Sequence, residues 1–180
     1  MGPLLTTPRL ELAPMSLAMV EAVMLGKRET AEAIAEAKLP DAWPGAALIE
    51  RAFSASLDRI RAAPEERLWG DRLIVIRSDG NRGPRCIVGS VVFHGRPGPD
   101  GVAEVAYGVE EASQGLGYAT EATRACVDWA LTQPGVVAVT ATTAAWHRAS
   151  LRVIQKIGMS PIGTRDHDLL GELLVFELRR

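Results

Sequence analysis

The sequence predicts a mixed α/β fold in a single domain that spans residues 1–180. Three observations support this. Apolar residues at helical spacing dominate the N-terminal part, short apolar segments joined by tight turns occupy the middle, and helices and strands alternate after that. The chain is 180 residues long and 47% hydrophobic, which is enough for one sizeable core, and no linker-like stretch divides it.

The N-terminal part predicts one short strand and three helices, over residues 9–13, 16–25, 30–37 and 48–62. The helices carry apolar residues at spacings of three and four, as at Leu17, Val20 and Met24. Pro14 ends the strand, and Pro64 follows the last helix. Helices therefore come before most of the sheet.

The middle of the chain predicts three strands joined by short turns, over residues 73–76, 86–93 and 102–109. Short turns of this kind join antiparallel neighbours, so these strands form a meander. After them we expect a helix, a strand, a helix and two final strands, over 117–131, 136–143, 148–157, around Ile162 and over 172–178. The result is a mixed, mostly antiparallel sheet.

The composition excludes several classes of protein. The net charge is −2 and the pI is about 6.0, so the basic field of a nonspecific nucleic-acid binder is absent. No apolar run approaches the roughly 20 residues of a membrane span. The two cysteines, Cys86 and Cys126, lack CxxC partners, so we expect neither a disulfide framework nor a metal site. From the charge and the lack of a long apolar run, we expect no nucleic-acid or membrane partner. The N-terminus lacks a signal-peptide profile, so we expect a cytoplasmic protein.

A glycine-bearing loop connects a predicted strand to a predicted helix at residues 107–122. Helix N-termini present unpaired N–H groups and the positive end of the helix dipole. Glycines at Gly115 and Gly117 let the backbone approach an anion closely. The loop therefore predicts a phosphate or pyrophosphate site. Thr120 stands where a dinucleotide fingerprint has its third glycine, and no Gly-Lys-Ser/Thr of a Walker loop is present.

The pattern Gln114-x-x-Gly117-x-Ala119 resembles the pyrophosphate loop of the GNAT superfamily of acetyl-CoA-dependent N-acetyltransferases. Its extension over 117–122, GYATEA, resembles the branch of ribosomal-protein N-terminal acetyltransferases. The opening over 7–10, TPRL, and the segment over 149–158 are similar to the first and last motifs of that branch. The resemblance covers nearly the whole chain. It implies a GNAT-like central sheet with helices on both faces, and acetyl-CoA as cosubstrate.

The resemblance also implies a set of cofactor-binding residues. In the family, the strand before the loop bulges and diverges from its neighbour, and its backbone binds the pantetheine amides. Val109 matches that position and is a candidate donor to the oxyanion. The other positions that match the cofactor-binding residues of the family are Gln114, Gly115, Leu116, Gly117, Tyr118, Ala119, Thr120, His147 and Ser150.

Glu104 is the candidate base, acting directly or through water. It shares one face of its strand with two small residues, Ala106 and Gly108, which leave room for a ligand. Gly108 also suggests a bulge or a close backbone approach. The alternative is a carboxylate paired with an arginine. Tyr107, on the other face, is a candidate core residue.

Ser150 is the second catalytic candidate, and it would assist the leaving sulfur or hold pantetheine. The alternative is a residue of the first helical turn that bonds its own backbone. His147 stands three residues earlier, where the family commonly has a cofactor-contacting Asn. A histidine could donate a hydrogen bond there, or it could be an exposed residue before the helix.

The acceptor is expected to be an amine, on a small molecule or at a protein N-terminus, and the protein a monomer or homodimer. Trp43 is a candidate wall of the acceptor site. A non-catalytic acyl-CoA-binding or sensor domain on the same scaffold is the alternative, because His147 replaces the usual Asn. A nucleotide-binding protein that uses the same loop is a third possibility.

Overall fold

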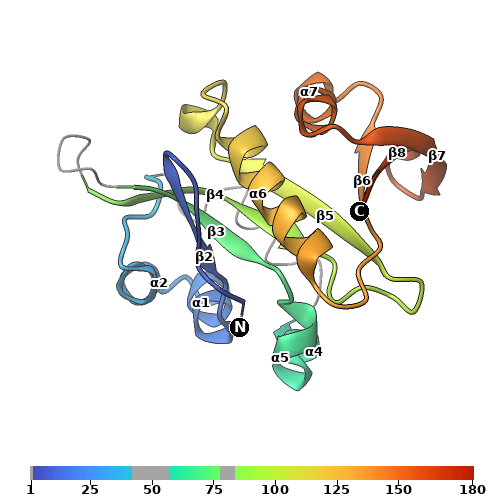
Figure 1. The fold of residues 1–180 in the computed structure, drawn as a ribbon. Helices are drawn as coiled ribbons and strands as arrows, with labels where there is room; N and C mark the ends of the chain where they lie inside the picture. The colour runs from blue at the N-terminus through green and yellow to red at the C-terminus, as the bar shows by residue number, and fades with distance from the viewer. Residues whose placement is uncertain (1, 42–56, 78–83) are drawn as a thin grey trace.

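The computed structural model describes residues 2–41, 57–77 and 84–180. Trp43, most of the expected helix over 48–62 and most of the turn before Cys86 lie outside these ranges. The described strands form one eight-stranded sheet in the order β1-β2-β3-β4-β5-β6-β8-β7 (Figure 1). Within the described residues, β5 and β6 are the one pair of parallel neighbours, so the sheet is mixed and mostly antiparallel, as expected.

The strands are β1 (Leu5–Thr6), β2 (Leu10–Pro14), β3 (Arg72–Ile76), β4 (Cys86–Phe93), β5 (Val102–Val109), β6 (Ala138–Ala144), β7 (Ser160–His167) and β8 (Gly171–Arg179). The helices are α1 (Leu17–Met24), α2 (Arg28–Ala35), α4 (Leu57–Ala62), α5 (Pro64–Arg67), the 3-10 turn η1 (Glu111–Ser113), α6 (Tyr118–Thr132) and α7 (Arg148–Ile157). None of the helices in the described ranges is long and apolar enough to cross a membrane.

Two buried clusters lie on opposite faces of the sheet. One contains Cys126 of α6 and Ile154 of α7, packed against strand residues such as Val105. The other contains Met19 of α1 and Val92 of β4. Helices therefore cover both faces, as expected, with α6 across one face and α1 on the other (Figure 1).

The expected elements agree with the structure where the sequence signal is local. The bounds of β4, β5 and α7 are those predicted. Two differences concern prolines: Pro14 is the last residue of β2, and Pro64 begins α5 instead of only following a helix. Proline suits the first helical position because the N–H that it lacks has no partner there. The two-residue strand β1 carries too little pattern to be predicted.

The sheet is close-packed between β4 and β5 and open between β5 and β6. A Cβ on Gly89 would lie 2.1 Å from the Gly108 carbonyl oxygen, which is the close backbone approach expected at Gly108. The pairing of β4 with β5 is continuous, whereas register shifts lie between β3 and β4, at Ile74 and Val75, and between β7 and β8, at Pro161 and Gly163. The bulge is therefore not in β5. By contrast, β5 pairs with β6 over Val102–Glu104 alone.

Candidate functional site

The site begins where β6 diverges from β5. Glu110 N–H donates to Val88 O at 2.8 Å, and His94 N–H donates to Glu104 O at 3.0 Å. Alternate residues of an antiparallel strand direct their backbone groups to opposite sides. The backbone groups of Val105, Tyr107 and Val109 therefore face the opening between β5 and β6. This open edge of β5 begins at Val105, just after the paired residue Glu104, and extends about 14 Å to Val109, at about 3.4 Å per residue.

The open edge leads into the glycine loop. Gly115 and Gly117 have φ values of 77° and 84°, in the left-handed region that favours glycine. Gly117 is the N-cap of α6, and no side chain caps this helix. Tyr118, Ala119 and Thr120 form the first turn, whose N–H groups lack acceptors within the helix. The loop itself, with Leu116 between the glycines, is exposed, so these donors are accessible to an anion.

Gln114 has two hydrogen-bond partners within the protein. Its side-chain amide donates to the Val109 carbonyl at 3.0 Å, and its backbone N–H donates to Glu111 O at 3.1 Å. Gln114 therefore ties the loop to the end of β5. Both backbone groups of Val109 face the opening, and Gln114 bonds the carbonyl.

Glu104 is surrounded by donors on the face opposite α6. Arg165 of β7 donates to both carboxylate oxygens, at 3.2 and 2.8 Å, and Thr142 donates at 2.8 Å. The imidazole of His94 lies 3.5 Å away. These contacts, with His94 first and Arg165 and Thr142 after it, hold the pKa of Glu104 well below its usual range despite burial. The arginine-paired arrangement that the sequence left open is the one present.

Ser150 lies in the first turn of α7, beside β5. The Tyr107 hydroxyl is 2.9 Å from Ser150 Oγ and donates to Ser150 O at 3.1 Å. Tyr107 packs at the edge of the core, as expected, and its hydroxyl also anchors a candidate catalytic residue. Sequence pattern did not reveal this second role, because the two residues are 43 positions apart.

His147 is exposed and caps α7. Its Nδ1 accepts the Ser150 N–H at 3.2 Å, and its ring stacks on Trp146 at 5.7 Å between centroids. Asn is a preferred N-cap residue because its side-chain oxygen accepts the same kind of bond. His147 thus fills the capping role that Asn would have, which accounts for the intact register of Ser150.

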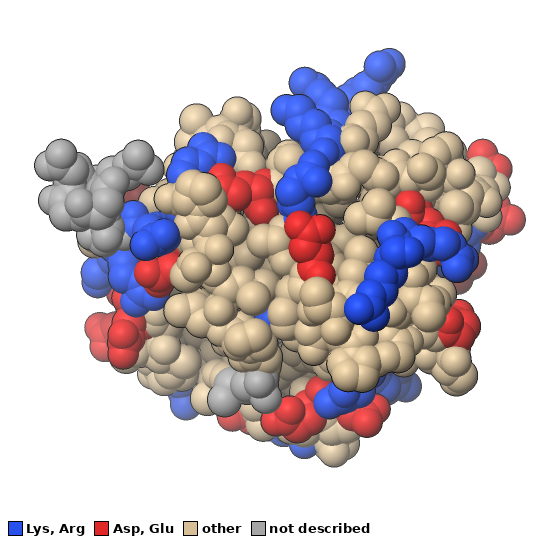
Figure 2. Space-filling view, in the orientation of Figure 1, with Lys and Arg blue, Asp and Glu red and all other residues tan. Residues whose placement is uncertain are grey.

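Basic side chains gather where α6 and α7 lie, at the upper edge of the molecule in Figure 2. The exposed basic residues of these two helices are Arg124, Arg148, Arg152 and Lys156. The net charge of −2 conceals this local excess of positive charge. These cations lie along α6 and α7, and they make this edge of the molecule attractive to anions.

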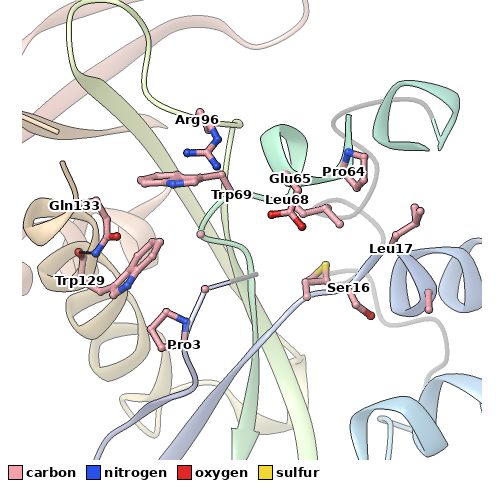
Figure 3. A pocket seen from close by; sticks show the side chains of 14 residues that line it. Pro3, Ser16, Leu17, Pro64, Glu65, Leu68, Trp69, Arg96, Trp129 and Gln133 are labelled. Atoms are coloured by element: carbon pink, nitrogen blue, oxygen red, sulfur yellow. Dashed lines mark hydrogen bonds between the residues drawn. The ribbon is translucent and has the colours of Figure 1, made fainter. Parts of the chain in front are cut away.

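A separate cavity of about 540 Å³ lies at the other end of α6. Figure 3 shows the indoles of Trp69 and Trp129 on one side, with Pro64 and Leu17 across from them. None of the residues expected to bind cofactor lines it. The cavity therefore does not belong to the site formed by β5 and the glycine loop.

The comparisons with known proteins agree with this geometry. A family model described as an acetyltransferase (GNAT) domain matches residues 9–160. The chain belongs to the GNAT acetyltransferase family. It is therefore an acyltransferase. No curated protein sequence matches it closely enough to count as a relative.

Several solved structures share the fold of this acetyltransferase. A putative GNAT-family acetyltransferase from Bordetella pertussis is 22% identical, with a TM-score of 0.64 over 98% of this chain and 99% of that one. The ribosomal-protein α-N-acetyltransferase RimL in complex with CoA is 13% identical, with a TM-score of 0.62 over 98% and 97%. The microcin C7 self-immunity acetyltransferase MccE, bound to acetyl-CoA and AMP, is 14% identical, with a TM-score of 0.62 over 97% and 94%.

Two further groups in this acetyltransferase bear on the chemistry. Burial raises the pKa of the Cys126 thiol to about 12, so Cys126 is a core residue and a poor nucleophile. Across residues 2–41, 57–77 and 84–180, no group of three or more His, Cys, Asp or Glu side chains could hold a metal ion.

Proposed function

We propose that this chain transfers the acetyl group of acetyl-CoA to a primary amine, and that residues 1–180 act as one N-acetyltransferase domain. The observation that carries the proposal is the continuous path from the uncapped N-terminus of α6 to the open edge of β5. The N-terminus of α6 suits an anion, and the open edge of β5 suits a chain of amides, which it can bind as an added strand would. Acetyl-CoA has its groups in this order: pyrophosphate, pantetheine amides, thioester.

The pyrophosphate binds to backbone N–H groups of the loop and the first turn of α6, from Gly115 to Thr120. Support comes from the left-handed glycines, the uncapped helix and the nearby cations. Two of the similar structures hold CoA or acetyl-CoA, which also supports this assignment. Gln114 contributes by fixing the loop to Val109, and not by contacting the phosphates.

The pantetheine arm lies along the open edge of β5, as an added strand would. The Val109 N–H suits the pantetheine amides because Val109 is at the loop end of the edge. The thioester then lies near Glu104, about 17 Å from Val109. For the oxyanion we assign the N–H groups of Val105 and Tyr107, which are nearer to Glu104 than Val109 is.

The reaction joins an amine nitrogen to the acetyl carbon. A neutral amine attacks the thioester carbonyl, the C–N bond forms, the C–S bond breaks, and CoA leaves as a thiolate. One proton leaves the nitrogen and one reaches the sulfur. The enzyme contributes by holding both reactants, stabilising the oxyanion and placing groups for the two proton transfers.

Glu104 serves the amine. Because Arg165 engages both of its oxygens, Glu104 stays ionised and is a weak base by itself. It attracts the ammonium form of the acceptor and orders the water that takes the proton. Ser150, held by Tyr107 and His147, protonates the departing thiolate.

An α-amine is the acceptor that this arrangement favours. Deprotonation at pH 7 costs about 1.4 kcal/mol for an α-amine with a pKa near 8, and about 4.6 kcal/mol for a lysine near 10.4. Because Glu104 is a weak base, it contributes little toward the larger free energy needed to deprotonate a lysine. A protein N-terminus or a free amino acid therefore suits the site better than a lysine side chain.

A two-part experiment tests the proposed function. First, CoA should raise the melting temperature of the protein, whereas ATP and NAD should not. Second, free CoA should appear when acetyl-CoA is mixed with a panel of peptide N-termini, amino acids, polyamines and amine-bearing antibiotics. Stabilisation by CoA without turnover of any amine would favour the non-catalytic acyl-CoA-binding alternative.

A further inference from the structure

The turn between β1 and β2 is hydrogen-bonded to the first turn of α6. Thr7 Oγ1 donates to one oxygen of Glu121 at 2.5 Å, and the Arg9 backbone N–H donates to the same oxygen at 3.1 Å. Arg9 Nε donates to the other oxygen at 2.7 Å. Burial opposes ionisation of Glu121, but these bonds outweigh it and hold its pKa below the usual value. The two ends of this contact are more than a hundred residues apart in sequence.

The same arginine also contacts the glycine loop. Arg9 Nη1 donates to the Leu116 carbonyl at 2.8 Å, and its guanidinium lies 4.8 Å from the centre of the Tyr118 ring. A Cβ on Gly117 would lie 3.3 Å from Arg9 Nη2. Arg9 therefore touches three consecutive residues of the loop while it is bonded to Glu121.

Two features of the loop make this contact consequential. A carbonyl that pointed outward at Leu116 would repel a bound anion, and Arg9 draws it toward the protein. Glu121 places a negative charge in the first turn of α6, beside the N–H groups, where it would also repel an anion. Arg9 and Thr7 neutralise and bond that carboxylate.

We propose that Arg9 is a positioning residue for the cofactor: together with Thr7 and Glu121 it clamps the glycine loop so that the loop can receive the CoA pyrophosphate. The inference rests on the proposed function, because it takes the loop as the pyrophosphate site. The clamp fixes the loop before the ligand arrives, which lowers the ordering cost of binding.

The test measures CoA affinity by calorimetry on the full chain, so it needs no knowledge of the acceptor. Arg9→Ala should weaken CoA binding about tenfold, as expected for one charge-assisted hydrogen bond. Glu121→Gln alone should weaken CoA binding less than Arg9→Ala does, because Arg9 can keep its bond to the Leu116 carbonyl and no unpaired carboxylate is left beside the phosphates. The double variant Arg9→Ala/Glu121→Gln should bind CoA severalfold more tightly than Arg9→Ala, because no unpaired carboxylate is left beside the phosphates.

Arg77→Ala is the matched control. Arg77 donates to the Thr7 carbonyl at 3.1 Å, in the same turn, and is not among the residues that bond the loop. It should leave CoA affinity unchanged. If Arg9→Ala does not fold, Arg9→Lys gives the same test, because an ammonium cannot bridge the Leu116 carbonyl and both Glu121 oxygens at once.

The outcomes separate this inference from the proposed function. If Gly117→Val weakens CoA binding but Arg9→Ala does not, the loop assignment stands and the clamp is wrong. A double variant that binds no more tightly than Arg9→Ala would also overturn the clamp. If Gly117→Val leaves CoA affinity unchanged, the loop is not the pyrophosphate site and both proposals fail.

Discussion

The two ends of α6 each meet an arginine and an aromatic ring, but in opposite surroundings. At the N-terminal end, Arg9 lies over Tyr118, is partly exposed and forms an ion pair with Glu121. At the C-terminal end, Arg72 lies over Trp129, 4.0 Å from the ring centre, and is fully buried. Its Nη1 donates to Gly70 O, and its Nε has no hydrogen-bond partner among the described residues.

The difference shows how one helix combines binding and stability. At the N-terminal end no side chain caps the helix, so its first N–H groups remain available to a ligand. The C-terminal end joins Trp129 to Trp69 and Phe93 in an aromatic cluster, where a cation over a desolvated ring stabilises the fold. Substitutions at the first end should therefore change ligand affinity, and those at the second should change stability.

The largest expected effect concerns turnover at the far end of the open edge. The N-terminal end of α6 binds the cofactor, whereas Glu104 serves the amine. Glu104→Gln should therefore lower turnover by about 10²–10⁴ and leave CoA affinity nearly unchanged. Steady-state kinetics with an acceptor from the amine screen, together with CoA calorimetry, measure both. Glu11→Gln, which alters a glutamate paired with Arg85 elsewhere in the sheet, is the control. Wild-type turnover in Glu104→Gln would contradict the role of this carboxylate.

Gly117→Val should weaken CoA binding by roughly 10- to 100-fold. Valine at a φ of 84° is strained by on the order of 1–3 kcal/mol, and relaxation would move the loop N–H groups. Gly135→Val is a matched control beyond the other end of α6, because Gly135 has a φ of 80° and open space around its Cβ position. The control should lose similar stability but bind CoA normally. Equal CoA affinities in the two variants would contradict the assignment of cofactor binding to the N-terminal end of α6.

Arg72→Ala should show the reverse pattern. Loss of the stacking on Trp129 and of the buried stem should cost about 3 kcal/mol of unfolding free energy. The melting temperature should then fall by roughly 6–12 °C. CoA affinity, measured well below the melting temperature, should stay at the wild-type value. A loss of CoA affinity with little loss of stability would place a functional role at this end as well.

His147→Ala should have a smaller effect, because it removes one helix cap. The lost bond to the Ser150 N–H should cost about 1 kcal/mol of stability. It should also loosen Ser150 and lower turnover modestly. His147→Asn should keep both properties near wild type, since Asn caps equally well. Identical melting temperatures and rates for wild type and His147→Ala would show that the cap contributes neither to stability nor to turnover.

The smallest effect is a pH response at the Arg9 end. The pKa of Glu121 is lower in the folded state, so its contribution to stability is present above its unfolded pKa of about 4.3 and is lost as the pH falls. Glu121→Gln should therefore lose under about 1 kcal/mol relative to wild type at pH 7 and less at pH 3.5. Urea unfolding at both pH values measures the difference. An equal difference at the two pH values would contradict the assignment.

Local patterns predicted the elements that form the site. The bounds of β5 and α7 follow from apolar periodicity and from short turns, which depend on neighbouring residues. The glycine loop was predicted for the same reason, since an αL glycine and a helix start lie within a few residues of each other. The partners of Glu104 and Ser150 were not predicted, because Arg165 and Tyr107 are 61 and 43 positions away from them.

The sequence by itself determined the order of the elements, the loop that opens α6 and the family to which these motifs point. Only the tertiary structure decided that Glu104 is engaged by Arg165, that His147 caps α7 and that the opening motif at Thr7 and Arg9 clamps Glu121. The physical reason is the range of the interactions. Backbone periodicity and turn preferences act between neighbours in the chain, whereas a carboxylate takes whichever donors the folded sheet brings within about 3 Å.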